Sequence, residues 1–273
     1  MTTATNETTP AATGAPRGTG STTTRVLGLT ALVGVGVLVG LGLFWSPPEE
    51  VQGDLARIMY VHVPSASLAY LSCFVTAAGS VMYLWKRSEW WDTLAYASAE
   101  IGALFMAFAC ITGSIWARPT WGTFWVWDDA RLVTSAMLLL LLLGYLALRK
   151  VPGDPDVRAK RSAWLGVLLP INVVLVRQSV EWWRTLHQKA TLQPLGGGAK
   201  IEDLMLFSLF VGFVVLTLVW VWLLIHRFRL AWLERRVEER ELSVAIDERR
   251  AEARVSGSGA ARFGSAIGPG GGP

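Results

Sequence analysis

Charged residues are scarce in this chain. Only 17% of its 273 residues are Asp, Glu, Lys or Arg, whereas 52% are hydrophobic. A soluble domain is about a quarter charged, so this excess of apolar side chains needs a covering that the chain's own core cannot provide. Several apolar runs, among them MLLLLLLGYLAL and LFVGFVVLTLVWVWLLI, approach or exceed the roughly 20 residues that a bilayer-spanning helix needs. The composition therefore predicts an all-α polytopic membrane protein and excludes a soluble fold.

Cysteine is nearly absent, and a nucleotide-binding loop is missing altogether. The two cysteines, Cys73 and Cys110, lie in apolar segments. Neither a disulfide framework, nor a CxxC redox site, nor a c-type haem attachment sequence is therefore available. The G-x-x-x-x-G-K-[ST] loop that cradles nucleotide phosphates does not occur, so any ATP hydrolysis would belong to a partner.

The apolar runs predict six transmembrane helices, flanked by polar tails. The helices are placed at residues 26–45, 58–85, 99–117, 132–149, 163–180 and 204–226. Pro64 is placed in the first turn of the second helix, where proline is tolerated, and Pro170 interrupts the fifth. Residues 1–25 are rich in Thr, Ala, Gly and Pro without an apolar core, so we expect a disordered tail rather than a cleaved signal. Residues 227–273 are expected to form a charged and then Gly-rich tail, with a helix over 235–254.

Basic residues indicate the orientation of the spans. Six spans place both termini on one side of the membrane, and 18 of the 25 Lys and Arg residues fall on that side. Half of those 18 lie beyond residue 226, in a tail that the positive-inside rule weights little, but the remaining split of nine against seven keeps the same sign. Both termini are therefore expected to be cytoplasmic. The connecting regions 46–57, 118–131 and 177–203 then face outward.

Two of the three histidines lie beside these outward regions. His62 belongs to the stretch RIMYVHVPS, about one turn into the second helix, and His187 belongs to SVEWWRTLHQ after the fifth. If the latter stretch is helical, Trp183 and His187 share a face at i,i+4. Taken singly, each histidine is most simply an interfacial side chain with a routine hydrogen bond. The third, His226, lies at the cytoplasmic end.

A further stretch, WGTFWVWDDAR at residues 121–131, packs three tryptophans beside two aspartates and an arginine. Seven of the fourteen tryptophans fall on the predicted outer side, which favours an aromatic belt at the membrane interface. A belt has no need of Asp128, Asp129 or Arg131, and it does not explain why two histidines reach the same edge. Neutral imidazoles can hold a haem iron axially, indole faces can cover a porphyrin, and arginine can pair with its propionates. The residues permit a haem site without requiring one.

In this order the motifs resemble the CcmC family, the haem exporter protein C of bacterial cytochrome c maturation, within a haem-handling superfamily marked by a tryptophan-rich WWD motif. The matching stretches are RIMYVHVP, GSIW, WGTFWVWD with ARL, and SVEWWRTLHQ, and the resemblance covers about residues 26–226. It implies a non-covalently held haem b with His62 and His187 as the two axial iron ligands. The cofactor-binding residues that follow from it are Trp121, Gly122, Trp125, Trp127 and Asp128, to which we add Arg131 at the rim and Trp183 beside the second histidine.

The resemblance also implies a function and a location. Members of the family present haem at the outer face of the bacterial cytoplasmic (inner) membrane and deliver it to a membrane-anchored haem chaperone, CcmE. An ABC transporter complex of CcmA, CcmB and CcmD then releases the loaded chaperone. Such a chain is a haem-binding transport component rather than an enzyme, in contact with membrane lipid and not with nucleic acid. In one respect this chain departs from its relatives. Their pattern runs Trp-Asp-x-Arg-Leu-Thr, whereas here Asp128 and Asp129 both follow Trp127, so the aspartate of the motif is ambiguous.

Three other functions stay open on the residues alone. A haem lyase or synthetase of the same superfamily would attach haem to apocytochrome c, but such proteins tend to have more spans and more histidines than this chain. A cytochrome b anchor usually holds its haem by histidines within the spans, whereas both candidates here lie at the outer edge. A structural subunit of an ABC-type complex would need the aromatic belt and no cofactor.

Overall fold

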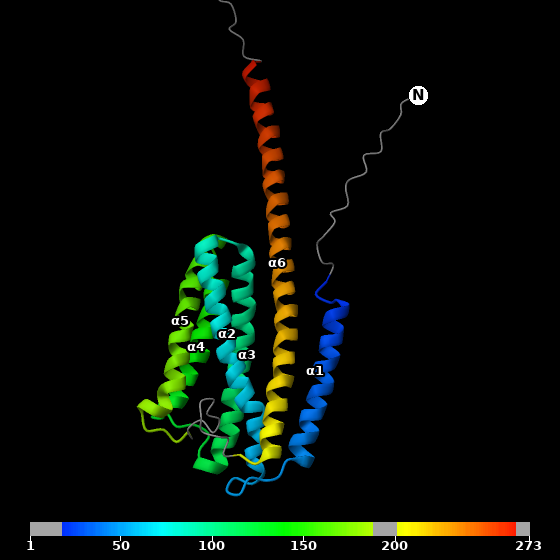
Figure 1. The fold of residues 1–273 in the computed structure, drawn as a ribbon. Coiled ribbons are helices and arrows are strands. Elements are labelled where there is room, and N and C mark those ends of the chain that lie inside the picture. Colours follow the sequence, from blue (N-terminus) through cyan, green and yellow to red (C-terminus); the bar gives the residue numbers. More distant parts are fainter. Residues whose placement is uncertain (1–17, 188–200, 266–273) are drawn as a thin grey trace, which may run out of the picture. The chain divides into compact units, whose positions relative to one another are not determined.

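The chain folds into helices, as the composition predicts. The computed structural model describes residues 18–187 and 201–265, with side chains described as far as residue 253. Its α-helices are α1 (Thr22–Gly40), α2 (Met59–Lys86), α3 (Glu89–Trp121), α4 (Ala130–Lys150), α5 (Pro155–Trp182) and α6 (Asp203–Ser265), with a π-helical turn η1 (Leu41–Trp45) after α1 and a 3-10 turn η2 (Asp54–Ile58) before α2 (Figure 1). In the described residues six helical segments are long and apolar enough to cross a membrane. The predicted all-α, six-span architecture is confirmed.

Two compact units divide the chain, one of residues Thr19–Arg229 and one that includes Leu230–Pro273. In the second unit the described helix is strongly charged, and ion pairs such as Arg236–Glu239 (3.3 Å) and Arg250–Asp247 (3.6 Å) join neighbouring turns. The helix expected over 235–254 is present as part of α6, which also contains the sixth span. It continues to Ser265, beyond the expected end at residue 254 and into the Gly-rich part of the tail. Residues 266–273 and 1–17 lie outside the described residues.

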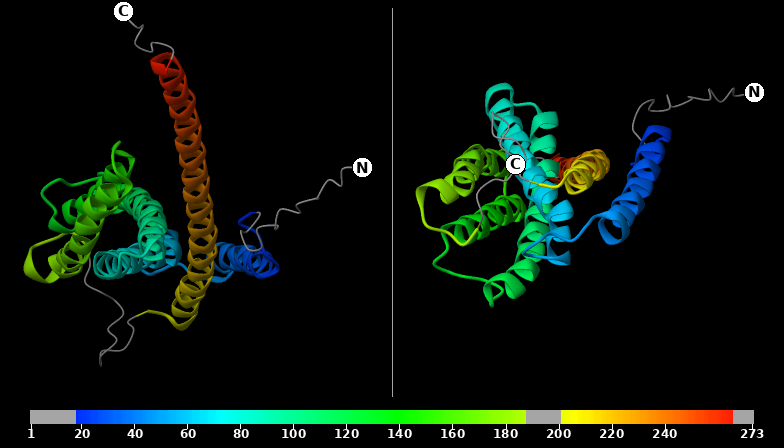
Figure 2. Two further views of the ribbon diagram at one scale, coloured as in Figure 1. Left: turned by 90° about the horizontal axis from the view of Figure 1, so that it is seen from above. Right: turned by 60° about the horizontal axis from the view of Figure 1, so that its bottom comes forward.

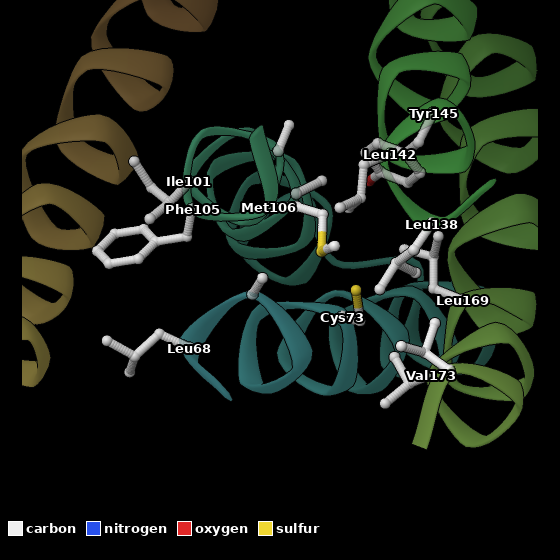
Figure 3. Close-up of a cluster of buried hydrophobic side chains, with 14 of the residues drawn as sticks. Leu68, Cys73, Ile101, Phe105, Met106, Leu138, Leu142, Tyr145, Leu169 and Val173 are labelled. Carbon is white, nitrogen blue, oxygen red and sulfur yellow. The ribbon is translucent and has the colours of Figure 1, made fainter. Parts of the chain in front are cut away.

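One cluster of buried hydrophobic residues in the first unit joins α2, α3, α4 and α5, and Trp220 of α6 also belongs to it. In Figure 3, Leu138 and Leu142 of α4 and Leu169 of α5 face Cys73 and Met106, whereas Leu68, Ile101 and Phe105 point to the opposite side. The run of leucines on α4 shows no periodicity in sequence, but buried and exposed residues alternate along it with the period of a helix. Leu138, Leu142 and Tyr145 are fully buried, at i, i+4 and i+7, whereas Leu140 and Leu143 are exposed. That spacing is one face of an α-helix. The exposed leucines are therefore the lipid-facing side of the span.

Small residues let α2 and α3 pack against each other along an extensive contact. A Cβ added at Gly79 would meet the carbonyl oxygen of Trp91 at 3.0 Å, and the Ser98 hydroxyl donates to the carbonyl of Ser72 at 3.0 Å. Close backbone approach at small residues is how helices associate where lipid supplies no hydrophobic drive. Seen from above, α4 and α5 lie on one side of this pair and α1 on the other (Figure 2).

A buried ion pair explains why α3 begins ten residues before the predicted start at residue 99. Arg149 of α4 donates both terminal nitrogens to the carboxylate of Asp92, at 2.6 and 2.8 Å, and the two side chains are only 13% and 3% exposed. Arg149 and Arg227 also lie over the Tyr96 ring, with their guanidinium carbons 4.6 and 4.7 Å from its centroid. The charge of Asp92, which suggests a loop in sequence, is thus compensated inside the bundle.

Both predicted proline effects differ from the structure. Pro64 is the sixth residue of α2 and not part of its first turn, because the 3-10 turn at Asp54–Ile58 already carries the chain into the helix. Pro170 lies inside α5, which continues through it to Trp182. Neighbouring helices stabilise a proline-containing span in a membrane, so neither proline ends its helix.

Candidate functional site

His62 and His187 both line one cavity of about 620 Å³. Its lining includes His62 on α2, His187 after α5, Trp121 at the end of α3, Trp125 in the following loop and Arg131 on α4. This volume is within the range of about 300–1,000 Å³ found for small-molecule and cofactor sites. Residues far apart in sequence thus meet at one place, as the sequence analysis predicts for these five.

The other four predicted residues, Gly122, Trp127, Asp128 and Trp183, are not part of the described lining. Gly122 ends α3 in a left-handed conformation (φ 78°) that favours glycine. Trp127 and Trp183 are 77% and 51% exposed, and their rings lie against Trp125 and Trp182, each at a centroid distance of 5.8 Å. Asp128 is exposed.

His62 is held between α2 and α3. Its Nδ1 lies 3.0 Å from the hydroxyl oxygen of Thr112, and a Cβ added at Gly113 would come within 3.1 Å of the imidazole Cε1. The absence of a side chain at residue 113 therefore makes room for the ring beside the backbone of α3. Neither residue has a role in the sequence analysis, although Gly113 begins the GSIW stretch that carries part of the resemblance.

The tryptophans form a wall where α3 ends. Trp116 meets Trp121 edge to face at 5.2 Å, and the indole nitrogen of Trp116 donates to the side-chain oxygen of Gln52 at 3.0 Å. Both Trp116 and Gln52 line the cavity and were missed by sequence reasoning, because only the fold brings them together. The indole nitrogen of Trp125 is buried without a hydrogen-bond partner among the described residues. A buried N–H in that state favours a ligand that accepts it.

Asp129 connects this wall to the second histidine. One carboxylate oxygen accepts from the backbone N–H groups of Arg131 and Leu132, at 2.9 and 3.1 Å, and so caps α4. The other oxygen accepts from the N–H of Leu186 at 2.7 Å. Asp129 is 3% exposed. These contacts favour Asp129 over the exposed Asp128 as the aspartate of the motif, and Asp129 also keeps the Asp-x-Arg spacing when counted back from Arg131.

His187 lies on an irregular segment. Because α5 ends at Trp182, the shared helical face of Trp183 and His187, which was conditional on a helix there, does not form. The backbone N–H of His187 donates to the Thr185 hydroxyl at 2.9 Å, and the next residue in the chain, 188, begins the stretch 188–200 that lies outside the described residues. This ligand candidate is therefore positioned by a turn and by Asp129, whereas His62 is positioned by a helix.

Charge in the cavity is unevenly distributed. Arg131 is the one Lys or Arg among the described lining residues, and its guanidinium donates to the carbonyl of Val176 at 3.1 Å. Three glutamates, Glu49, Glu50 and Glu202, also belong to the lining. Glu49 and Glu202 accept from nearby backbone N–H groups. Arg131 is thus the lining side chain suited to pairing with an anionic group inside the cavity.

The side chains that could bind a metal here suit an ion that is already held by a macrocycle better than a bare ion. The described residues hold no group of three or more His, Cys, Asp or Glu side chains that could bind a bare ion. Two imidazoles in an aromatic-walled cavity supply too few ligands for an isolated cation, but they match the two axial positions of a haem iron. Indole faces and a buried unpaired indole N–H suit the porphyrin.

Comparison with known proteins agrees with this chemistry. The family model described as heme exporter protein C, CcmC, matches residues 12–243. The chain belongs to the CcmC family. It is 38% identical to heme exporter protein C of Bradyrhizobium diazoefficiens over 200 residues, which cover 73% of this chain and 75% of that protein. It is 36% identical to heme exporter protein C of Haemophilus influenzae over 195 residues, covering 70% and 77%. It is 37% identical over 175 residues to a putative cytochrome c biosynthesis ccmC-like mitochondrial protein of Marchantia polymorpha, covering 63% and 74%.

Membership in the CcmC family confirms the resemblance read from the motifs. It places the chain among multi-pass membrane components of cytochrome c biogenesis, a transport and maturation class rather than an enzyme class. All the stretches that carry the resemblance fall within the matched residues.

Proposed function

We propose that this CcmC-family chain binds haem b non-covalently in the cavity, with His62 and His187 as the axial iron ligands, and delivers it for cytochrome c maturation. The observation that carries the proposal is the meeting of the two histidines, from α2 and from the segment after α5, in one cavity walled by tryptophans. Imidazole pairs of this kind hold haem iron without covalent attachment. The two cysteines lie in apolar segments without a CxxC partner, in agreement with non-covalent binding.

We assign roles to the remaining predicted residues according to how exposed they are. Trp121 and Trp125 cover the porphyrin, and Arg131 pairs with a propionate. Gly122 turns the chain from α3 into the loop that carries Trp125. Trp127, Asp128 and Trp183 are exposed, so they meet the cargo only at its rim, where a receiving protein also approaches. The role that the sequence analysis gives to Asp128 is better filled by Asp129.

The proposed partners supply ATP hydrolysis and accept the haem. Without a phosphate-binding loop, it depends on ABC transporter subunits of the CcmA, CcmB and CcmD kinds for any ATP-driven step. The acceptor is a haem chaperone of the CcmE kind. Family membership supports both assignments.

The proposed location is the bacterial inner membrane, with the cavity facing outward and both termini in the cytoplasm. The test is a cysteine at Thr123, an exposed position of the tryptophan loop, in a chain whose Cys73 and Cys110 are replaced. A membrane-impermeant thiol reagent should label intact spheroplasts. Labelling only after the membrane is opened would reverse the orientation and contradict outward delivery.

The ligand assignment is tested by the haem spectrum. Protein purified from haem-replete cells should carry low-spin haem b with a bis-histidine spectrum, and His62→Ala and His187→Ala should each lose that spectrum and most of the haem. The matched control is His226→Ala, because this third histidine packs against the Trp222 ring at 4.8 Å and does not belong to the cavity lining. Wild-type haem content and spectrum in both cavity variants would show that these histidines are not the ligands.

A further inference from the structure

The hydrogen bond between His62 and Thr112 has a direction, which the backbone of α3 determines. The Thr112 hydroxyl oxygen lies 2.8 Å from the carbonyl oxygen of Phe108 and 3.2 Å from that of Ala109. Carbonyl oxygens only accept, and a hydroxyl has one proton, so that proton is directed to these carbonyls. Towards His62 Nδ1, 3.0 Å away, the hydroxyl therefore accepts. The proton of the neutral imidazole is then on Nδ1, and Nε2 keeps its lone pair.

We propose that Thr112 is a positioning residue that holds His62 in the tautomer protonated on Nδ1, so that Nε2 is the nitrogen offered to the iron. The consequence for iron rests on the proposed haem function, whereas the tautomer is a property of the haem-free chain. Metal-bound histidines usually donate their other ring N–H to an oxygen acceptor, which fixes the tautomer and orientation of the ring and raises the basicity of the ligand. Thr112 supplies that acceptor from a neighbouring helix.

Two features make Thr112 suited to this role. The residue is 8% exposed, so water competes little for the histidine N–H. The next residue, Gly113, lets the ring approach the helix, since a Cβ there would lie 3.1 Å from Cε1 and 3.6 Å from Nδ1. His62 is therefore fixed both by a directional hydrogen bond and by the shape of the α3 surface. Rotation of the imidazole ring would break its hydrogen bond to Thr112.

The tautomer can be measured without haem. The chain has three histidines, so haem-free protein labelled with nitrogen-15 at histidine gives few ring signals by NMR, and His62→Ala identifies those of His62 by their loss. We expect the wild type and Thr112→Ser to be protonated on Nδ1, and Thr112→Val, which keeps the side-chain shape without the hydroxyl, to lose this preference. A wild-type His62 protonated on Nε2 would overturn the proposal whatever the chain binds.

Haem titration of the same proteins is the second readout. Thr112→Val should lower haem affinity by about 10–100-fold, the usual effect of removing such a partner, and Thr112→Ser should restore most of it. The control is Thr134→Val on α4, whose hydroxyl donates to the carbonyls of Ala130 and Arg131 in the same way. Wild-type tautomer and affinity in Thr112→Val would refute the positioning role. A shifted tautomer in Thr112→Val, combined with wild-type haem binding by His62→Ala, would uphold the hydrogen bond and reject His62 as a ligand.

Discussion

The doubled aspartate offers a matched pair of substitutions, because Asp128 and Asp129 are neighbours with opposite surroundings. Asp129→Ala removes three backbone hydrogen bonds. The two at the start of α4 form a helix cap, worth about 1 kcal/mol, and act on stability. The third, to the N–H of Leu186, holds the segment that carries His187, and a hydrogen bond to a charged group is worth about 1.5–3 kcal/mol. Asp128 is exposed and should contribute to neither.

The expected result is a difference in haem affinity between the two variants. If about 2 kcal/mol is lost from the arrangement that presents His187, affinity falls by about 30-fold, at 1.4 kcal/mol for each factor of ten. Asp129→Asn should lose less, because its one remaining oxygen can still accept. Titration of haem into the purified haem-free protein, followed by the Soret band, measures each affinity. Equal weakening by Asp128→Ala and Asp129→Ala, or no weakening by Asp129→Ala, would refute the reasoning.

Two further substitutions test the packing of the site and of the bundle. Gly113→Ala places a Cβ 3.1 Å from His62 Cε1, so haem affinity should fall by about tenfold, the low end of effects around a metal ligand; Gly144→Ala, whose Cβ has its nearest neighbour at 3.8 Å, should leave affinity unchanged in the same titration. Asp92→Ala leaves the buried guanidinium of Arg149 unpaired, so the free energy of unfolding should fall by about 3–5 kcal/mol and the thermal midpoint with it, and an unchanged midpoint would contradict a structural role for the pair.

The spans themselves could be predicted because their signal is local. Apolar runs of bilayer length are sufficient to place six helices, and the structure has six. The boundaries were wrong where tertiary contacts decide them. Asp92 lies inside α3 because Arg149, from another helix, neutralises it, and no pattern around residue 92 indicates that partner. The leucine run of α4 likewise contains no information on which leucines face the core.

The sequence indicated which kinds of residue belong to the candidate site, but not which side chains contact one another there. Two histidines and a tryptophan-rich loop on one predicted side of the membrane suggested the cavity, and five of the nine named residues line it. The role of Thr112 could not be predicted, because a threonine inside an apolar helix has no distinctive spacing. Its role depends on its contact with His62 of α2. The choice between the two aspartates depended on a hydrogen bond to Leu186, 57 residues away in sequence.

The cavity lining extends along the chain from Pro47 to Met205. A nascent chain that has inserted only α1 to α4 already contains His62 and the tryptophan loop, but neither His187 nor the start of α6. At a synthesis rate of about 5–20 residues per second, the interval between the synthesis of His62 and that of His187 is on the order of 10 s. Throughout that interval the growing protein offers a single imidazole and an incomplete wall. A chain that extends past Met205 is therefore the earliest form with the complete lining. Under the proposed function, a chain interrupted before His187 would lack one of the two axial ligands and could not hold haem from both sides.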